Sequence, residues 1–276
     1  MSNEIRSTDA ALTQDPNSAA PVERRRIALD IADVPFQVNE AINTLRGNIQ
    51  LSGYDIKLVG ITSALKHEGK SSLAFRLAKS FAALDKRTLY LDCDIRNSQT
   101  LSRYGIKKKK KGLTEYLCGN AEMEEIVWKT SEPYLEMIFT GAVAPNPSEL
   151  FSGKLFSDLL AAVRDYYDYV IVDTPPVNAV IDGVLIAKQC DGTILVVESG
   201  VTDRLQVVRA KQQLDYAGVK LLGVALNKIG SGNGRYGYGY GYGYGYGYGY
   251  GYGKGYGYGY GEEPKKRGSR LRKKKN

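Results

Sequence analysis

The residues best suited to chemistry form a short run that combines glycine, lysine and serine. The segment Ala64-Leu65-Lys66-His67-Glu68-Gly69-Lys70-Ser71-Ser72 lies between a predicted strand and a predicted helix. It matches the phosphate-binding pattern G-x-x-x-x-G-K-[ST], except that Ala64 replaces the first glycine. In such a loop, backbone N–H groups hold phosphate oxygens, the lysine neutralises the outer phosphates and the first hydroxyl binds Mg²⁺. We therefore expect residues 64–72 to bind a nucleoside triphosphate.

Three acidic residues lie at the ends of two apolar strands. Asp92 and Asp94 occupy alternate positions after Leu89-Tyr90-Leu91, and Asp173 ends a strand before two prolines. Carboxylates beside a triphosphate repel it unless Mg²⁺ lies between them. One acid of the first pair would then coordinate metal and the other would orient or deprotonate an incoming hydroxyl, and Asp173 would bind Mg²⁺ through water. The alternative is a pair of solvated loop acids.

Tyrosine alternates with glycine between Arg235 and Glu262, which supplies many such hydroxyls. Twelve of the 21 tyrosines lie in this tract: Tyr236, Tyr238, Tyr240, Tyr242, Tyr244, Tyr246, Tyr248, Tyr250, Tyr252, Tyr256, Tyr258 and Tyr260. A phenol, whose pKa is near 10, benefits from a nearby base. One chain thus combines a phosphoryl-transfer site with an array of acceptors, and we predict that the site modifies the array.

The elements that position these residues alternate between strands and helices. We expect helices at 35–49, 70–84, 147–166, 182–188 and 203–216, and strands at 57–62, 87–92, 134–139, 169–173, 193–198 and 221–227. The strand cores are continuously apolar, which is typical of a parallel sheet covered on both faces. The sequence predicts a doubly wound, mostly parallel α/β fold. Ligands bind beyond the carboxyl ends of such strands, so the tract after Asn227 starts near the site.

Composition divides the chain of 276 residues into a domain and two tails. We expect disorder in residues 1–26, a folded domain at 27–229, and a disordered acceptor tail at 230–276 with a basic tip. Of the net charge of +8, residues 262–276 carry +6 (eight Lys or Arg minus two Glu). A basic tip serves solubility or contacts an anionic surface, and we favour the membrane surface. No nucleic-acid partner is expected.

The three cysteines, Cys93, Cys118 and Cys190, have no metal-ligand spacing and are odd in number. This usage favours a reducing cytosol over a disulfide framework. Neither a signal-peptide core nor an apolar run of about 20 residues is evident. We therefore expect a cytoplasmic protein.

Together these motifs resemble the bacterial tyrosine kinases of capsule and exopolysaccharide synthesis, whose domain is similar to a P-loop ATPase. The resemblance runs from about Glu40 to Asn227, and a C-terminal tyrosine cluster follows. It is carried by Gly69-Lys70-Ser71, Asp92-Cys93-Asp94-Ile95-Arg96, Gly112-Leu113-Thr114, Pro147-Ser148-Glu149-Leu150, Tyr169-Val170-Ile171-Val172-Asp173-Thr174-Pro175-Pro176 and Leu226-Asn227-Lys228.

The resemblance implies a kinase that uses ATP and Mg²⁺. Lys70 and Ser71 would bind ATP and magnesium, with Asn227 in the nucleotide site. Asp92 would act on the acceptor hydroxyl and the metal, and Asp94 and Asp173 would complete the magnesium environment. Lys70, Asp92 and Asp94 are therefore the expected catalytic residues, and the tyrosine tract is the expected autophosphorylation target.

The resemblance also implies partners. Relatives of this type form ring-like homo-oligomers through a motif E-x-x-R-x-x-R, in which Glu40 and Arg46 match but Asn43 replaces the first arginine. They also act with a membrane adaptor that recruits the kinase to the inner face of the membrane, and with a cognate tyrosine phosphatase. Lys66-His67 stands where many relatives have Pro-Gly, which reduces the backbone freedom of the loop.

Two other functions fit parts of the sequence. A partition- or cell-division-type ATPase switch shares the fold, but its signature lysine would stand at Leu65. Alternatively, the Tyr-Gly tract is an adhesive low-complexity segment attached to an ATPase. Glycine opposes strand formation by about 0.5–1 kcal/mol per residue relative to alanine, so we favour a mobile substrate.

Overall fold

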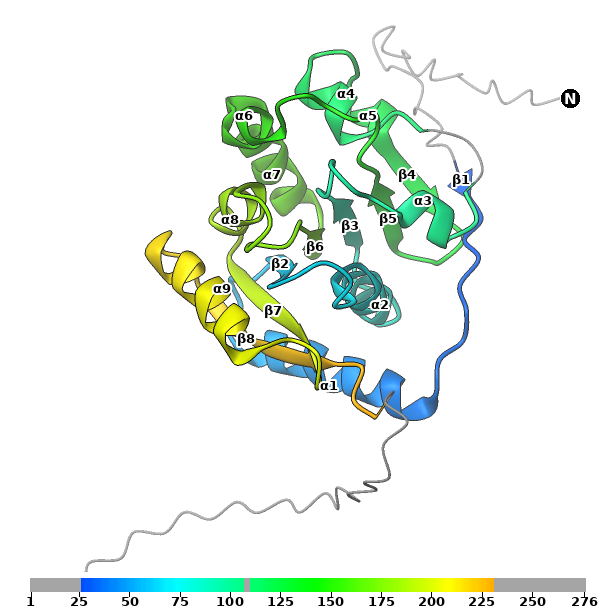
Figure 1. The fold of residues 1–276 in the computed structure, drawn as a ribbon. Helices are drawn as coiled ribbons and strands as arrows, with labels where there is room; N and C mark the ends of the chain where they lie inside the picture. Colours follow the sequence, from blue (N-terminus) through cyan, green and yellow to red (C-terminus); the bar gives the residue numbers. More distant parts are fainter. Residues whose placement is uncertain (1–25, 107–109, 231–276) are drawn as a thin grey trace, which may run out of the picture. The chain divides into compact units, whose positions relative to one another are not determined.

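An eight-stranded sheet organises the residues that the computed structural model describes, 26–106 and 110–230 (Figure 1). Its order is β1-β4-β5-β3-β6-β2-β7-β8. The β4–β5 pair is antiparallel, and every other pair of neighbouring strands is parallel. The strands are β1 Arg26–Ile27, β2 Leu58–Ser63, β3 Thr88–Asp92, β4 Val127–Thr130, β5 Leu135–Ile138, β6 Tyr169–Asp173, β7 Gly192–Glu198 and β8 Leu221–Asn227. The predicted doubly wound, mostly parallel fold is confirmed. Both predicted tails and the tyrosine tract lie almost wholly outside the described residues.

Helices cover both faces of this sheet (Figure 1). They are α1 Phe36–Leu51, α2 Lys70–Ala82, α3 Thr100–Arg103, α4 Leu113–Leu117, α5 Met123–Ile126, α6 Pro147–Ser152, α7 Lys154–Tyr166, α8 Asp182–Ala187 and α9 Arg204–Tyr216. Side chains of α2 pack on Tyr90 and Ile171, whereas side chains of α7 pack on the alternate residues Leu89 and Val170. Successive residues of a strand face opposite sides, so these strands are buried on both faces and read as apolar runs.

The segment predicted as one helix at 147–166 forms two helices. Gly153 separates α6 from α7 with φ −75° and ψ 157°, which is extended backbone. Apolar spacing continues across the break, since Phe151 and Phe156 pack in the same cluster with ring centroids 5.0 Å apart. The hydrophobic pattern therefore did not reveal the interruption.

The carboxyl ends of the central strands bring the chemical residues to one edge. Asp92 and Asp173 are register partners on β3 and β6, and β2 leads directly into the predicted phosphate loop. None of the helices in the described ranges has both the length and the apolar character needed to cross a membrane.

Candidate functional site

The phosphate loop spans residues 64–69 between β2 and α2. Two of its residues have left-handed backbone, His67 with φ +68° and Gly69 with φ +92°. Such alternation forms a concave arrangement of backbone N–H groups that suits anions. Among the described residues, no hydrogen-bond acceptor lies against the N–H groups of His67, Glu68 and Gly69. These donors are available for phosphate oxygens.

Groups at and just after the ends of β7 and β8, together with the loop itself, hold this conformation. The carboxylate of Glu68, of which 2% is exposed, accepts hydrogen bonds from Leu65 N at 2.6 Å, Glu198 N at 3.4 Å and the Thr202 hydroxyl. Asn227 Nδ2 donates to Glu68 O at 2.9 Å, and Lys228 Nζ donates to His67 O at 2.7 Å. The Glu68 side chain thus faces inward as an anchor, leaving its backbone for ligand contact.

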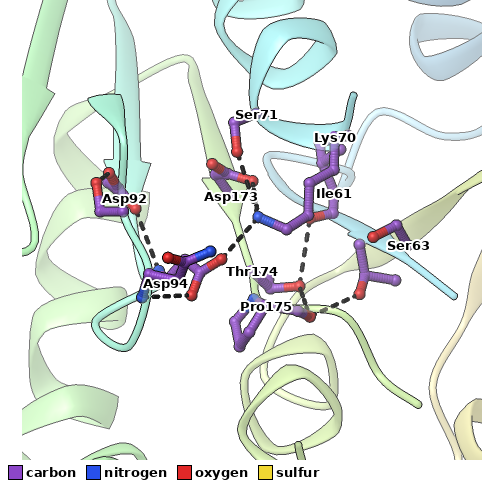
Figure 2. Close-up of polar contacts among 12 residues, drawn as sticks. Ile61, Ser63, Lys70, Ser71, Asp92, Asp94, Asp173, Thr174 and Pro175 are labelled. Carbon is purple, nitrogen blue, oxygen red and sulfur yellow. Dashed lines mark hydrogen bonds and ion pairs between the residues drawn. The ribbon is translucent and has the colours of Figure 1, made fainter. Parts of the chain in front are cut away.

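Lys70, the first residue of α2, lies between two carboxylates (Figure 2). Its Nζ is 2.9 Å from Asp94 Oδ2 and 3.6 Å from Asp173 Oδ1, and it donates to Ser71 Oγ at 3.2 Å. Burial opposes the charge of Lys70, but attraction to Asp173, Asp94 and Asp92 outweighs it and raises the pKa of Lys70 above its ordinary value. The lysine is therefore cationic at neutral pH.

Asp92 is fully buried behind this cluster. Its Oδ2 accepts a hydrogen bond from Ser98 Oγ at 2.5 Å, and its Oδ1 accepts one from Asp94 N at 3.1 Å. Burial and the neighbouring charge of Asp173 raise the pKa of Asp92 to about 6, although Ser98, Thr100 and Lys70 oppose the shift. Asp94, in contrast, lines the cavity next to the loop.

Asp173 is held by a tyrosine of the neighbouring strand β3, a role that the sequence did not predict. The Tyr90 hydroxyl donates to Asp173 Oδ2 at 3.0 Å, while buried Asp173 Oδ1 has no hydrogen-bond partner among the described residues. Burial, together with the charges of Asp173 and Asp92, raises the pKa of Tyr90 well above its ordinary value. Tyr90 therefore keeps its proton and remains a donor. A polar-tipped residue within an apolar strand was the only signal for it.

A cavity of about 470 Å³ opens beside the loop. It is lined by His67, Lys70, Asp94, Arg96, Arg103 and Pro176, among others. Arg96 Nε donates to buried Asp182 at 2.6 Å, and Ser148 Oγ donates to the same carboxylate at 2.5 Å. The guanidinium of Arg96 is thus held at the rim by two segments distant in sequence.

These residues fit a magnesium ion that is shared with phosphates. No three His, Cys, Asp or Glu side chains of the described part of the chain converge as a metal cage. Mg²⁺ in phosphoryl-transfer sites needs no such cage, because water, phosphates and one or two carboxylates complete its shell. The Ser71 hydroxyl is a suitable protein oxygen, and so is Asp173 Oδ1, which accepts no hydrogen bond from the described residues and lies 3.6 Å from Lys70 Nζ. Asp94 becomes a third if Lys70 moves to a phosphate.

The remaining predicted residues are distributed as follows. Ala64 is buried at the base of the loop, whereas Leu65 and Lys66 are exposed. Glu40 and Arg46 lie on α1: Glu40 accepts from Asn43 at 3.1 Å, and Arg46 donates to Ser80 O at 2.8 Å within the same chain. The acceptor tyrosines between 236 and 260 lie outside the described residues. The contacts of Tyr90, Ser98, Asp182 and Lys228 could not be predicted from the sequence.

Comparisons with known proteins agree on one family. Residues 57–202 match the family described as an AAA domain. The chain is 40% identical over 193 residues to the tyrosine-protein kinase CpsD of Streptococcus agalactiae serotype III (strain NEM316), covering 70% of this chain and 83% of that protein. It is 37% identical over 214 residues to the tyrosine-protein kinase YwqD of Bacillus subtilis (strain 168), covering 76% and 89%.

Solved structures are similar as well. The kinase domain of the Escherichia coli tyrosine kinase ETK superposes with a TM-score of 0.67 at 30% identity, covering 76% of this chain and 87% of that domain. The cell division ATPase MinD of Pyrococcus furiosus, at 19% identity and a TM-score of 0.56, covers 64% and 74% and shares the fold.

Proposed function

The chain belongs to the family of bacterial tyrosine-protein kinases, and we propose that it transfers the γ-phosphoryl group of ATP to the tyrosines of its own C-terminal tract on neighbouring copies of the chain. The observation that carries the proposal is the position of Lys70 at the start of α2, bridging Asp94 and Asp173. A cation and two carboxylates beside unpaired loop N–H groups are the parts that phosphoryl transfer needs.

Each residue has a distinct role in this proposal. The loop N–H groups and Lys70 bind the phosphates, and Ser71, Asp94 and Asp173 would hold Mg²⁺. When bound, this ion would neutralise charge that develops on the phosphate oxygens. The tyrosine oxygen forms a bond to the γ-phosphorus as the bond to ADP breaks, and the phenolic proton passes to a carboxylate.

The family resemblance implies that Asp92 is the carboxylate that accepts the phenolic proton. In the structure Asp94 lines the cavity, while Asp92 is enclosed by Ser98 and the backbone of Asp94. Two arrangements are compatible with this geometry: Asp94 takes the proton directly, or Asp92 acts after the turn at 93–98 opens. We propose the second, because the family resemblance assigns the acceptor hydroxyl to Asp92, and because Asp94 is needed to hold Mg²⁺.

We further propose that phosphorylation of the tract regulates the polymerisation and export of a capsular polysaccharide or exopolysaccharide. The expected partners are further copies of the chain, a membrane adaptor that recruits it to the inner face of the membrane, and a tyrosine phosphatase. The resemblance to the kinases of polysaccharide synthesis supports this part of the proposal. The partition-type ATPase switch is disfavoured by Leu65, which stands where that class has its lysine.

Phosphotyrosine mapping tests the kinase assignment. Purified protein and a Lys70→Met variant are incubated with Mg²⁺ and ATP, with and without an adaptor fragment, and analysed by mass spectrometry. Wild type should acquire phosphate on Tyr236–Tyr260 and the variant none. ATP hydrolysis without any phosphotyrosine would instead indicate the ATPase switch.

A mixing experiment tests transfer between copies. A chain truncated after residue 230 supplies an active site without acceptors, and the full-length Lys70→Met chain supplies acceptors without activity. Phosphotyrosine on the Lys70→Met chain supports transfer between copies. Labelling that occurs only on full-length active chains contradicts it.

A further inference from the structure

Two consecutive residues at the end of β8 bind two consecutive peptide groups of the phosphate loop. Asn227 donates to the carbonyl of Glu68 at 2.9 Å, and Lys228 donates to the carbonyl of His67 at 2.7 Å. In a planar trans peptide the C=O and N–H point in opposite directions. Holding both carbonyls toward β8 therefore turns the N–H groups of Glu68 and Gly69 away from β8. The end of β8 sets the direction of donors that the loop offers to phosphate.

Lys228 contacts the loop residue that has the least favourable backbone conformation. His67 has φ +68°, a left-handed conformation that is unfavourable for any residue with a Cβ atom and costs glycine little. Among the described residues, no other hydrogen bond is donated to the His67 carbonyl. Without an external hydrogen bond, His67 would favour φ below zero and rotate the adjoining peptide group.

The ammonium of Lys228 is itself held in place. It lies 2.8 Å from Glu198 Oε2 at the end of β7, and 37% of the Lys228 side chain and 18% of the Glu198 side chain are exposed. Glu198 also donates its backbone N–H to the Glu68 carboxylate at 3.4 Å. Lys228 thus connects the loop to two neighbouring strands.

We propose that Lys228 is a positioning residue that holds the phosphate loop in its binding conformation by fixing the His67 peptide group. The inference rests on the proposed binding of nucleotide phosphates by this loop. It assigns Lys228 an effect on nucleotide affinity that acts through the backbone of residue 67. The alternative is that Lys228 attracts the phosphates directly as a cation.

The first test measures ADP binding in the presence of Mg²⁺ by titration calorimetry, for wild type and Lys228→Met. We expect the affinity for ADP to fall about tenfold, which corresponds to the cost of one left-handed residue with a side chain. Lys228→Arg, which can still donate to the carbonyl, should restore most of the affinity. Lys220→Met is the matched control, because Lys220 is exposed and lies just before β8; this variant should bind ADP as wild type does. Thermal unfolding of each variant verifies that it is folded.

The second test uses residue 67 itself. Because glycine adopts positive φ readily, His67→Gly should make the loop less dependent on Lys228. Lys228→Met should then reduce ADP affinity by about twofold in the His67→Gly background, against about tenfold in wild type. Equal losses in the two backgrounds would overturn the proposal.

The third test separates positioning from direct attraction by the sign of the effect. Glu198→Gln removes the negative charge that attracts the Lys228 ammonium, while Lys228 keeps its own positive charge. Positioning predicts weaker ADP binding, since Lys228 is held less firmly. Direct attraction predicts stronger binding, since a negative charge near the site has been removed.

Unchanged ADP affinity in Lys228→Met would also reject the inference. Wild type that fails to bind ADP at all would reject the proposed function instead. The two failures are therefore distinguishable in one series of measurements.

Discussion

Lys70 Nζ lies 2.9 Å from Asp94 Oδ2, an ion pair between the first residue of α2 and the loop after β3. About one tenth of each side chain is exposed, 10% for Lys70 and 9% for Asp94. The same ammonium is the group expected to reach nucleotide phosphates. Phosphate and Asp94 thus compete for one lysine, so nucleotide binding would free Asp94 for magnesium.

Lys70→Met should destabilise the protein in the absence of nucleotide. Removal of the cation leaves Asp94 and Asp173 close together and largely buried, which costs about 3 kcal/mol of unfolding free energy near pH 7.5. Urea unfolding at pH 7.5 measures the loss, with Lys79→Met as control, because 40% of the Lys79 side chain is exposed. A loss no larger than that of the control would show that the two buried carboxylates are not the cause.

Asp92→Asn should make the protein more stable but less active at neutral pH. The pKa of Asp92 is raised in the folded state to about 6 from 3.8, so between these values the folded protein holds a proton that the unfolded chain has released. Its contribution to stability therefore falls as pH rises from about 4 to 6, by on the order of 3 kcal/mol. The unfolding free energy of the Asp92→Asn variant should not show this fall with pH.

Stability and activity profiles against pH test that prediction. Wild type and Asp92→Asn should have similar unfolding free energies at pH 4 and differ most above pH 6. Phosphotyrosine formation by wild type should rise through about pH 6 as Asp92 loses its proton. Parallel stability profiles for the two proteins would contradict the assignment of the buried acid.

Tyr90→Phe should weaken the use of magnesium. The substitution removes the hydrogen bond from the Tyr90 hydroxyl to Asp173 Oδ2 and costs about 1–2 kcal/mol of stability. Asp173 would then be less firmly oriented, and phosphorylation should need a higher Mg²⁺ concentration for half-maximal rate. Tyr169→Phe is the matched control, since its ring stacks on Phe81 and its substitution leaves Asp173 untouched. Identical Mg²⁺ dependence in both variants would refute the role of Tyr90.

Gly69→Ala should abolish nucleotide binding while the fold persists. Gly69 has φ +92°, and an added Cβ would collide with the Asn227 amide that holds the loop. Gly47→Ala is the control: it lies in α1 with no atom within 4 Å of an added Cβ. That variant should keep ADP affinity and gain up to about 1 kcal/mol of stability, as alanine favours helix. ADP binding by Gly69→Ala at wild-type affinity would exclude the expected loop geometry.

Phosphorylation of the tract should drive assembled copies apart. At −1.5 to −2 per phosphate, twelve modified tyrosines add roughly −18 to −24 of charge, far more than the basic tip balances. Light scattering before and after phosphatase treatment measures the size of the assembly. A variant in which the twelve tyrosines between 236 and 260 are replaced by Phe controls for effects that do not depend on charge. The size of its assembly should not change when ATP is added.

Local sequence patterns determined the framework of the site. Gly69-Lys70-Ser71 between an apolar strand and a helix predicted the loop, and the acids at strand ends predicted carboxylates at the same edge. Strand and helix periodicity depends on neighbours only a few residues away, so these features can be recognised in the chain itself. The break at Gly153 could not be recognised in this way, because packing on both sides of the break preserves the apolar spacing.

Tertiary structure decided which polar atoms meet. Lys70 and Asp94 are 24 residues apart, Tyr90 and Asp173 are 83 apart, and His67 and Lys228 are 161 apart. Such contacts depend on strand order and on burial, which sets where a charged group needs a partner. The sequence by itself determined the phosphate loop, the fold class and the supply of acceptor tyrosines. Only the folded sheet, by bringing β3, β6 and β8 to one edge, enclosed Asp92, paired Lys70 and brought Lys228 to the loop.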